Sequence, residues 1–391
     1  MAIRYIDELD LAGKRVFIRA DFNVPLKNGA ITDATRIEAA LPTVRHALAG
    51  GAHVVLASHL GRPKGGPDPK LSLKPVAERL AALLHLEVKL APDCVGPEVE
   101  GLARSLDRKD VLLLENLRFH PEEEKNDPGF ARQLAALADV YVDDAFGAAH
   151  RAHASTEGMA RLVPVRAAGL LMKKEVRALS KVTEHPERPL VAILGGAKVS
   201  DKIKVIEHLL TKVDTLLIGG AMAYTFLRAQ GQTTGDSLVE EDRVDVARQV
   251  LARANELGVA LRLPTDHLVS SAIDGSAPAE VATAIAAGKR GVDVGPATVE
   301  LYRGEIAKAR TIFWNGPMGI FEVDAFSKGT TAIADALADS KALTVVGGGD
   351  SIAALSRSGR SGDITHISTG GGASLEFLEG RVLPGLAVLE Q

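Results

Sequence analysis

Basic, acidic and amide side chains recur in the first half of the sequence at the points where apolar runs end. They are Asp21, Asn23, Ser58, His59, Arg62, Glu115, Asn116, Arg118, Asp143 and Asp144. Arg36, near the start of a predicted helix, and the cluster of His150, Arg151 and His153 could join them. Any one of them alone is more simply a surface charge or half of a structural salt bridge. Several basic side chains at one place repel one another unless an anion lies between them, and a planar guanidinium meets carboxylate or phosphate oxygens in pairs. The first half is therefore predicted to hold an anion pocket.

Glycines occupy the corresponding positions in the second half. They stand in five short stretches, at 195–196, 219–220, 315–317, 347–350 and 370–372. Glycine lets the backbone approach a ligand closely, and a helix that begins after such a turn presents free N–H groups to phosphate oxygens. Lys198 and Lys202 add positive charge on one side of a helix expected to begin at Ser200 and Asp201. The second half is therefore predicted to bind a nucleotide through its phosphates.

Each of these features also has a simpler interpretation. The lysines of an ordinary strand–turn–helix unit are solvated, and Asp350 and Ser351 at a helix start serve as N-caps. The sequence contains no Walker A motif, and the stretch from Gly347 to Ile352 lacks the third glycine of the dinucleotide fingerprint. An NAD-dependent dehydrogenase is therefore a weaker hypothesis than a site for nucleotide phosphates.

The elements that must position these residues alternate between strand and helix. Strands are predicted at 16–20, 53–58, 88, 111–114 and 140–142, then at 190–194, 215–218, 260–263, 311–314, 343–346 and 364–368, with helices at 35–49, 73–84 and 130–138 in the first half. Repeated βα units of this size predict an α/β protein with a doubly wound parallel sheet in each half. Such a sheet brings the carboxyl ends of its strands to one edge. Arg19, inside a strand, is interpreted as a buried structural partner.

A helix predicted at 170–184 separates the two halves. Two prolines between 185 and 189 end it, which is typical of a semi-rigid connector between domains. The chain of 391 residues, with 46% hydrophobic and 25% charged residues, has the composition of a two-domain globular protein. Its formal charge of −4 gives no overall attraction to nucleic acid or to a membrane. Cys94 is the only cysteine, which excludes a disulfide framework.

The sequence shows no apolar signal core and no apolar run of membrane-spanning length, so a cytoplasmic protein is expected. Eight blocks of the sequence are each several residues long. They are RADFNVP at 19–25, SHLGRP at 58–63, ENLRF at 115–119, AHRAH at 149–153, GGAKVSDKI at 195–203, WNGPMGIFE at 314–322, GGGDS at 347–351 and STGGGA at 368–373. Together they resemble the signature blocks of the phosphoglycerate kinase family. They occur in the family's order and span nearly the whole chain, and no motif position departs in a way that threatens activity.

The resemblance implies two Rossmann-like lobes joined by a connecting helix. Residues 1–169 would bind 3-phosphoglycerate or 1,3-bisphosphoglycerate, 170–189 would form the connector, 190–379 would bind ADP or ATP with Mg²⁺, and 380–391 would pack back on the first lobe. The implied reaction is the reversible transfer of a phosphoryl group from 1,3-bisphosphoglycerate to ADP, which gives 3-phosphoglycerate and ATP in glycolysis. A monomer with no nucleic-acid or membrane partner is expected.

The resemblance also assigns roles to residues of the first lobe. Around the glycerate carboxyl and hydroxyl it places Asp21, Phe22 and Asn23, and around the distal phosphate it places His59, Arg62, Arg118 and Arg151, with Leu60 and Gly61 shaping the loop. Arg36 would face the acyl carboxyl and the phosphoryl group in transfer.

In the second lobe the implied nucleotide site uses side chains and glycines together. Lys198 and Lys202 would contact the phosphates, with Lys198 at the transferred one, and Asp350 would hold Mg²⁺. Gly348, Gly349 and Ser351 would donate hydrogen bonds, and Asn315 and Pro317 would line the phosphate and sugar site. Glu322 would bind the ribose hydroxyls, and Gly219, Gly220 and Gly291 would flank adenine. Gly371 and Gly372, at a helix start, would join Arg36 and Lys198 in stabilising the transition state.

This chemistry needs positioning and charge neutralisation rather than a covalent nucleophile. A carboxylate acceptor is already ionised at neutral pH, so no general base is required. Three other classes remain as hypotheses. A dehydrogenase would need the missing fingerprint, and an exported two-lobed solute binder would normally carry a signal peptide. A catalytically inactive relative that binds nucleotides or anions is the third, and the presence of Arg36, Lys198 and Asp350 argues against it.

Overall fold

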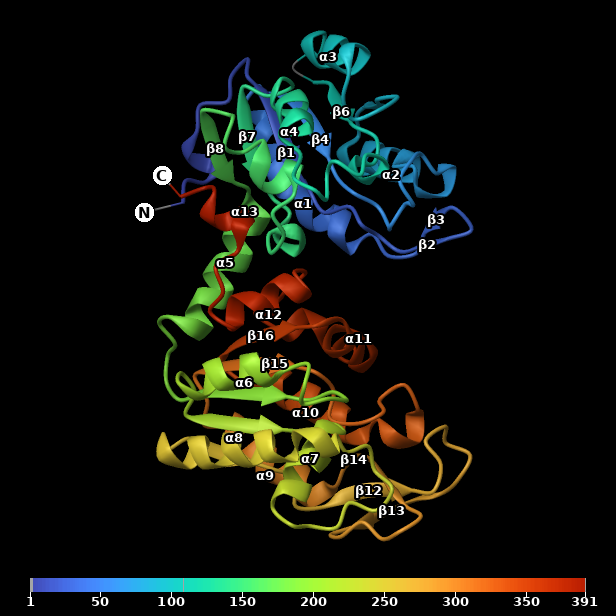
Figure 1. The fold of residues 1–391 in the computed structure, drawn as a ribbon, viewed down its shortest axis with the longest axis vertical. Coiled ribbons are helices and arrows are strands. Elements are labelled where there is room, and N and C mark those ends of the chain that lie inside the picture. Colours follow the sequence, from blue (N-terminus) through green and yellow to red (C-terminus); the bar gives the residue numbers. More distant parts are fainter. Residues whose placement is uncertain (1–2, 108, 391) are drawn as a thin grey trace. The chain divides into compact units, whose positions relative to one another are not determined.

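The computed structural model describes residues 3–107 and 109–390, and the chain forms two compact units (Figure 1). Unit 1 comprises Met1–Val176 with Val382–Gln391, and unit 2 comprises Arg177–Arg381. Helix α5 (Leu170–Thr183) contains the boundary between them. None of the helices described is both long enough and apolar enough to span a bilayer.

Unit 1 is built on a sheet of six parallel strands in the order β5-β6-β4-β1-β7-β8. The strands are β1 (Arg15–Arg19), β4 (His53–Ala57), β5 (Val88–Leu90), β6 (Val111–Leu113), β7 (Val140–Asp143) and β8 (Val165–Ala168). Side chains of β6 and β7 are buried along their whole length, as expected of parallel strands that are covered on both faces. The chain leaves β1 toward β4 and later returns to β7 on the other side of β1, so the winding reverses at β1. Ligands bind at such a switch point in doubly wound sheets.

Helices α1 (Thr35–Ala49) and α2 (Lys74–Leu84) supply part of the apolar core of this unit. Helices α3 (Pro97–Arg104) and α4 (Pro128–Ala135) belong to the same unit. Gly51, with φ +76°, lies just past the end of α1, in the left-handed conformation that glycine adopts without strain. The hairpin strands β2 (Leu26–Lys27) and β3 (Ala30–Ile31) lie between β1 and α1.

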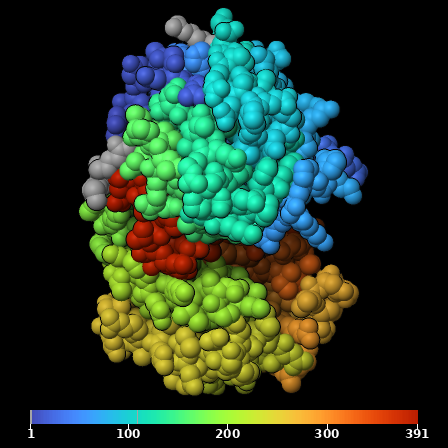
Figure 2. All heavy atoms as spheres, turned by 45° about the horizontal axis from the view of Figure 1, so that its top comes forward, coloured from blue at the N-terminus to red at the C-terminus, as the bar shows by residue number. Residues whose placement is uncertain are grey.

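The C-terminal segment belongs to unit 1. Its short helix α13 (Pro384–Ala387) lies against this unit, where the Gly385 N–H donates to the Ala149 carbonyl at 2.9 Å. The Arg166 Nε in β8 donates to the Val388 carbonyl at 2.7 Å. The first residue of the segment, Val382, is 80% exposed, and residues near the C-terminus are visible at the surface in Figure 2 (red). Residues far apart in the chain thus complete the same unit.

Unit 2 repeats the architecture, with parallel strands in the order β11-β10-β9-β15-β16-β17. The strands are β9 (Leu190–Leu194), β10 (Thr215–Ile218), β11 (Ala260–Arg262), β15 (Thr311–Asn315), β16 (Leu343–Gly347) and β17 (His366–Ile367), and the helices are α6 (Ile203–Leu210), α7 (Met222–Ala229), α8 (Val244–Glu256), α9 (Pro296–Ile306), α10 (Lys328–Ala338), α11 (Gly349–Ser358) and α12 (Gly372–Leu378). The switch point lies between β9 and β15. The predicted α/β class with doubly wound parallel sheets is confirmed.

Several elements were not predicted. Unit 2 contains a separate antiparallel sheet of β12 (His267–Ser270), β13 (Ala279–Ala282) and β14 (Arg290–Val294). Strand β8 and helix α3 were missed as well. The helix expected from Ser200 begins only at Ile203, because the Ser200 N–H and Oγ–H both donate to Glu240, at 3.1 and 2.5 Å. Lys198 and Lys202 therefore precede the helix and do not lie on its side.

The first prediction concerns the close approach of two turns in unit 2. A Cβ atom added at Gly195 would lie 2.0 Å from the Pro317 carbonyl oxygen, which is backbone and cannot rotate away. Gly195→Ala should therefore lower the free energy of unfolding of unit 2 by about 1–3 kcal/mol, as overpacking does. In Gly304→Ala, on the exposed side of α9, the added Cβ has no neighbour within 4 Å. That control should raise stability by about 0.5–1 kcal/mol. Urea denaturation of both variants decides the matter, and equal stability of the two would contradict it.

Candidate anion and nucleotide sites

The segment that follows β1 is tied to both α1 and the loop after β4. Asp21 Oδ2 accepts a hydrogen bond from Arg36 Nη1 at 2.8 Å, and the two side chains are 11% and 35% exposed. Asn23 Oδ1 accepts from the Gly61 N–H at 2.9 Å. The buried Phe22 donates its N–H to Ser58 Oγ at 2.8 Å. Arg36 uses only one of its five N–H donors in this ion pair, so the others remain available to a ligand.

A second set of bonds shapes the loop after β4. The Asn116 side chain, which follows β6, accepts from the Leu60 N–H at 3.1 Å and donates to the Leu60 carbonyl at 2.7 Å. Arg118 Nη1 donates to the Gly61 carbonyl at 3.0 Å, so Gly61 (φ +63°) is held from both sides. Arg62 follows it, exposed, and has no hydrogen-bond or ion-pair partner in residues 3–107 and 109–390.

Like charges gather around His59. Its side chain is buried, and Arg19 Nη2 lies 3.2 Å from Nδ1. Burial is the largest cause that lowers its pKa well below the ordinary value, and Arg19, Arg118 and Arg36 add to the effect. His59 is therefore neutral at physiological pH. Arg36 and Arg118, two of the predicted site residues, therefore lie close enough to His59 to lower its pKa.

The loop after β7 brings further basic groups to the same cluster. Burial, followed by the charges of Arg19, Arg118 and Arg151, lowers the pKa of His153 to about 4. Arg151 itself is exposed, and its Nε lies 3.1 Å from His150 Nε2. Burial also lowers the pKa of Arg118, with Glu124 opposing and Arg19 and Arg151 reinforcing the shift. Such a concentration of positive charge at the carboxyl edge of a sheet is complementary to an anion.

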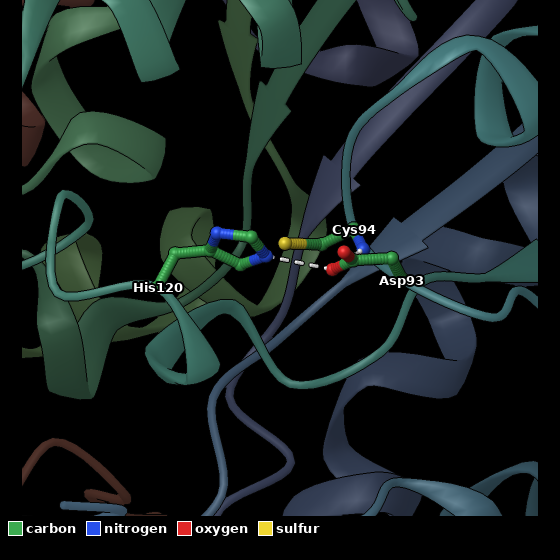
Figure 3. Close-up of side chains that lie close together, drawn as sticks. All are labelled: Asp93, Cys94 and His120. Atoms are coloured by element: carbon green, nitrogen blue, oxygen red, sulfur yellow. Dashed lines mark hydrogen bonds and ion pairs between the residues drawn. The ribbon is translucent and has the colours of Figure 1, made fainter. Parts of the chain in front are cut away.

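Asp93, Cys94 and His120 form a compact group that the sequence did not reveal (Figure 3). Their ligand atoms lie within 4.8 Å of one another, as a metal site requires. Asp93 Oδ1 already accepts from the Cys94 N–H at 2.6 Å and lies 2.7 Å from His120 Nε2, and burial followed by Asp93 raises the pKa of the Cys94 thiol. These bonds are complete without a metal. They tie the loop after β5 to the 3₁₀ turn Leu117–Phe119, which carries Arg118.

In unit 2 the turns at the switch point pack directly against each other. The Gly196 N–H donates to the Pro317 carbonyl and the Gly220 N–H to the Met318 carbonyl, both at 3.0 Å. A Cβ at Gly219 would lie 2.4 Å from Met318 Sδ. The absence of a side chain at Gly195 and Gly219 thus serves the packing of turn on turn. That these glycines also let the backbone approach a ligand stays a prediction.

Lys202 lies half-buried beside this packing. Its Nζ donates to Asn315 Oδ1, and Asn315 Nδ2 donates to the Gly347 carbonyl at 2.8 Å. Burial lowers the pKa of Lys202 to about 8, although the carboxylates of Asp201 and Asp350 oppose the shift. Lys198 is exposed and makes no hydrogen bond within the part of the chain that the structure describes. The two lysines therefore differ in environment: Lys202 is half-buried and bonded to Asn315, and Lys198 is exposed.

Asp350 and Ser351 do not act as N-caps. Helix α11 has Gly348, with φ +90°, at its N-cap, and Asp350 lies exposed in its first turn. The Ser351 hydroxyl accepts from the Gly316 N–H at 2.5 Å and so fixes the turn after β15. The Asp350 carboxylate has no hydrogen-bond donor among the described residues, and carboxylate oxygens are the ligands that Mg²⁺ prefers. An unengaged carboxylate close enough to interact with Lys202 fits a Mg²⁺–phosphate group.

A cavity of about 710 Å³ opens beside these turns. Of the predicted nucleotide residues, Gly220, Gly291, Pro317, Glu322 and Asp350 line it. Gly219, Asn315, Lys198, Lys202, Gly348, Gly349 and Ser351 are not among its lining residues. Leu238, which is 53% exposed, and Ile273, 49% exposed, also line it and were missed. The sequence could not identify these two residues, because only a structure shows that their apolar side chains are exposed beside the cavity. A cavity of this size and apolar character suits a nucleoside.

Gly371 and Gly372 stand at the start of α12, after β17. Gly371 is its N-cap, with φ +53°, and an added Cβ there would have no neighbour within 4 Å. The Ser368 and Ser374 hydroxyls, 2.6 Å apart, brace the turn. Because β17 pairs with β16, this helix start lies at the same sheet edge as Asp350.

The comparisons with known proteins agree over the whole chain. A family model described as phosphoglycerate kinase matches residues 6–381. Relatives named phosphoglycerate kinase from Anaeromyxobacter sp. (strain K) and from Solibacter usitatus (strain Ellin6076) are each 60% identical and cover 100% of both chains. The solved structure of phosphoglycerate kinase from Coxiella burnetii is 44% identical, covers 99% of each chain and superimposes with a TM-score of 0.93.

The second prediction follows from the burial of Lys202. In protein labelled with ¹³C at the lysine ε-carbon, one resonance should titrate with a midpoint at about 8, and it should vanish in Lys202→Arg. Pyrophosphate should raise that midpoint, because a nearby anion favours the charged ammonium. Above the midpoint Lys202 loses its charge, so pyrophosphate affinity should fall with rising pH. A Lys202 midpoint near the ordinary value of about 10.4 would contradict the prediction.

Proposed function

The chain belongs to the phosphoglycerate kinase family, and on that premise we propose how its own residues carry out the reaction. The protein is a kinase of glycolysis, a phosphotransferase with a carboxyl group as acceptor. It transfers a phosphoryl group reversibly between 1,3-bisphosphoglycerate and ADP, giving 3-phosphoglycerate and ATP. The comparisons give no support to the alternative of an inactive binding protein.

We assign the glycerate substrate to the first lobe, residues 1–169. The observation that carries this assignment is that Arg19, Arg118 and Arg36 all lie close enough to the buried His59 to add to the effect of burial in lowering its pKa. Arg62, Arg118 and Arg151, with His59, would bind the distal phosphate, which is the same before and after transfer. Asp21 and Asn23, with the backbone of Phe22, would bind the glycerate carboxyl and hydroxyl. The bonds of Leu60 and Gly61 hold the phosphate loop ready for this contact.

We assign the nucleotide to the second lobe, residues 190–379. The cavity lined by Gly220, Gly291 and Leu238 would receive adenine, and Glu322 at its rim would bind the ribose hydroxyls. Lys202, Asn315 and the start of α11 would meet the phosphates. Asp350 would hold Mg²⁺, which when bound neutralises phosphate charge. Residues 170–189 would connect the lobes, and residues 380–391 would complete the first.

Catalysis would rest on charges that converge on the phosphoryl group in transfer. Arg36 and Lys198 would meet its oxygens and the acyl oxygen, and the N–H groups at Gly371 and Gly372 would donate to the same oxygens. Stabilisation of charge that exists only in the transition state raises turnover, whereas contacts equal in both states affect binding alone. We further propose that the protein acts as a monomer in the cytoplasm, without a nucleic-acid or membrane partner.

The third prediction separates Arg36 from the binding arginines. Arg36→Ala should lower kcat in a coupled assay of ATP formation from 1,3-bisphosphoglycerate by roughly 10³-fold or more, by analogy with arginine fingers. Arg36→Lys should recover little, because a point charge cannot replace paired donors. Arg62→Ala should mainly raise KM for the glycerate substrate. Near-normal kcat with a raised KM in Arg36→Ala would make Arg36 a binding residue. An inactive wild-type chain that still bound both ligands would refute the proposed function.

The fourth prediction tests the assignment of Asp350. Asp350→Asn should weaken Mg-ADP binding by roughly tenfold or more, since even outer partners of a metal contribute 10–100-fold. Affinity for 3-phosphoglycerate should stay unchanged, because that site is assigned to a separate folding unit. Asp245→Asn, on an 84% exposed side chain of α8, is the matched control. Calorimetric titration of each ligand decides the matter, and equal loss of both affinities would make Asp350 a structural residue.

A further inference from the structure

We propose that Arg19 fixes the neutral His59 ring as its Nε2–H tautomer, so that Nε2 donates a hydrogen bond to the anion bound in unit 1. Arg19 would then be a positioning residue that acts through His59. The inference rests on the proposed function only where the anion is identified as 3-phosphoglycerate. The tautomer itself is a property of the free protein.

The argument begins with the contact between the two side chains. Arg19 is the last residue of β1 and is 1% exposed, and its Nη2 lies 3.2 Å from His59 Nδ1. A guanidinium has donors only and stays protonated in proteins, so Nδ1 must be the acceptor in this contact. A neutral imidazole carries one proton, which therefore belongs to Nε2. The opposite tautomer would set two N–H donors against each other, and an imidazolium would add like charge at the same distance.

The orientation of Arg19 is fixed from its other side. Arg19 Nε donates to Ser155 Oγ at 2.7 Å, and Nη1 donates to the Ala20 carbonyl. The Ser155 hydroxyl donates in turn to Glu123 Oε1 at 2.5 Å, and the Ser155 N–H donates to Oε2 at 2.9 Å. Because the hydroxyl proton points to Glu123, a lone pair of Oγ faces Arg19. The direction of every hydrogen bond from Glu123 to His59 is thereby determined.

Glu123 also supplies the charge that allows Arg19 to be buried. Its side chain is 0% exposed. Burial of the carboxyl raises the pKa of Glu123, and Arg19 is the largest cause that opposes the rise. His59 Nε2, by contrast, has no hydrogen-bond partner among residues 3–107 and 109–390. One ring nitrogen is thus committed to the interior and the other is left for a ligand. An Nε2–H donor is what an anionic ligand requires.

The test reads the tautomer directly. In protein with ¹⁵N-labelled histidine, long-range ¹⁵N–¹H spectra should show a protonated Nε2 and an unprotonated Nδ1 for His59, assigned with His59→Gln. Arg19→Met removes the donor at similar length, and it should give mixed tautomers and weaken 3-phosphoglycerate binding about ten- to hundredfold, as expected for one charge-assisted hydrogen bond. Arg19→Lys should restore the tautomer. Arg15→Met, an arginine of the same strand that pairs with Asp139, should change neither property.

Two results would overturn the proposal: a protonated Nδ1 in the wild-type spectrum, or an Arg19→Met protein with unchanged tautomer and affinity. If Arg19→Met does not fold, Ser155→Ala takes its place, since it removes the hydroxyl that orients Arg19. It should shift the tautomer in the same direction, and an unaltered spectrum would count against the proposal. A wild-type Nε2–H pattern in a protein that does not bind 3-phosphoglycerate would refute the proposed ligand and leave the tautomer assignment intact.

Discussion

A parallel sheet that is covered on both faces carries polar side chains mainly at the ends of its central strands. All residues of β6 and β9 are apolar and buried, so the polar side chains that could bind a ligand lie in the turns that follow these strands. The doubly wound order then places the carboxyl ends of the strands at one edge. Most of the predicted site residues, from Asp21 to Gly372, lie in or near such a turn or at the start of the helix after it. Gly291, in β14 of the antiparallel sheet, does not. The position of both sites depends on this constraint.

The two sheets meet the same constraint with different chemistry. In unit 1 the turns carry long basic side chains, and their positive charges add to the effect of burial in lowering the pKa values of His59 and His153. In unit 2 the turns carry glycines that pack on one another, and charge is limited to a few groups such as Lys202 and Asp350. A guanidinium fork suits a phosphate held throughout the reaction. A partly apolar cavity with few charges suits a nucleoside whose phosphates extend to its rim.

The local sequence pattern was sufficient to predict an element whose bounds are determined by residues within it or directly beside it. Helix α1 was predicted at about its observed bounds, 35–49, because its end is marked by the two glycines that follow it directly in the sequence, Gly50 and Gly51. The pattern failed where a partner distant in sequence decides the outcome. Ser200 does not begin a helix because Glu240, 40 residues away, accepts its hydrogen bonds. The small sheet of β12, β13 and β14 was missed because two of its strands, β12 and β13, have partly exposed residues and no continuous apolar run.

The same limit explains what was missed in the sites. Asp93 and His120 lie on separate turns, and only the fold shows that their bond joins the loop after β5 to the turn that carries Arg118. Behind the basic edge of unit 1 stand acidic groups that do not point toward a ligand: Glu123 bonds Ser155, and Glu115 accepts the Leu73 N–H at 3.2 Å. Buried carboxylates of this kind balance part of the positive charge and fix the backbone that carries it. The exposed Arg62 and Arg151 are not paired with these buried carboxylates, so their positive charge faces solvent. The interpretation of Arg19 as a buried structural partner is therefore compatible with a role in the site, since the contacts that make its burial tolerable also set the hydrogen-bonding state of His59.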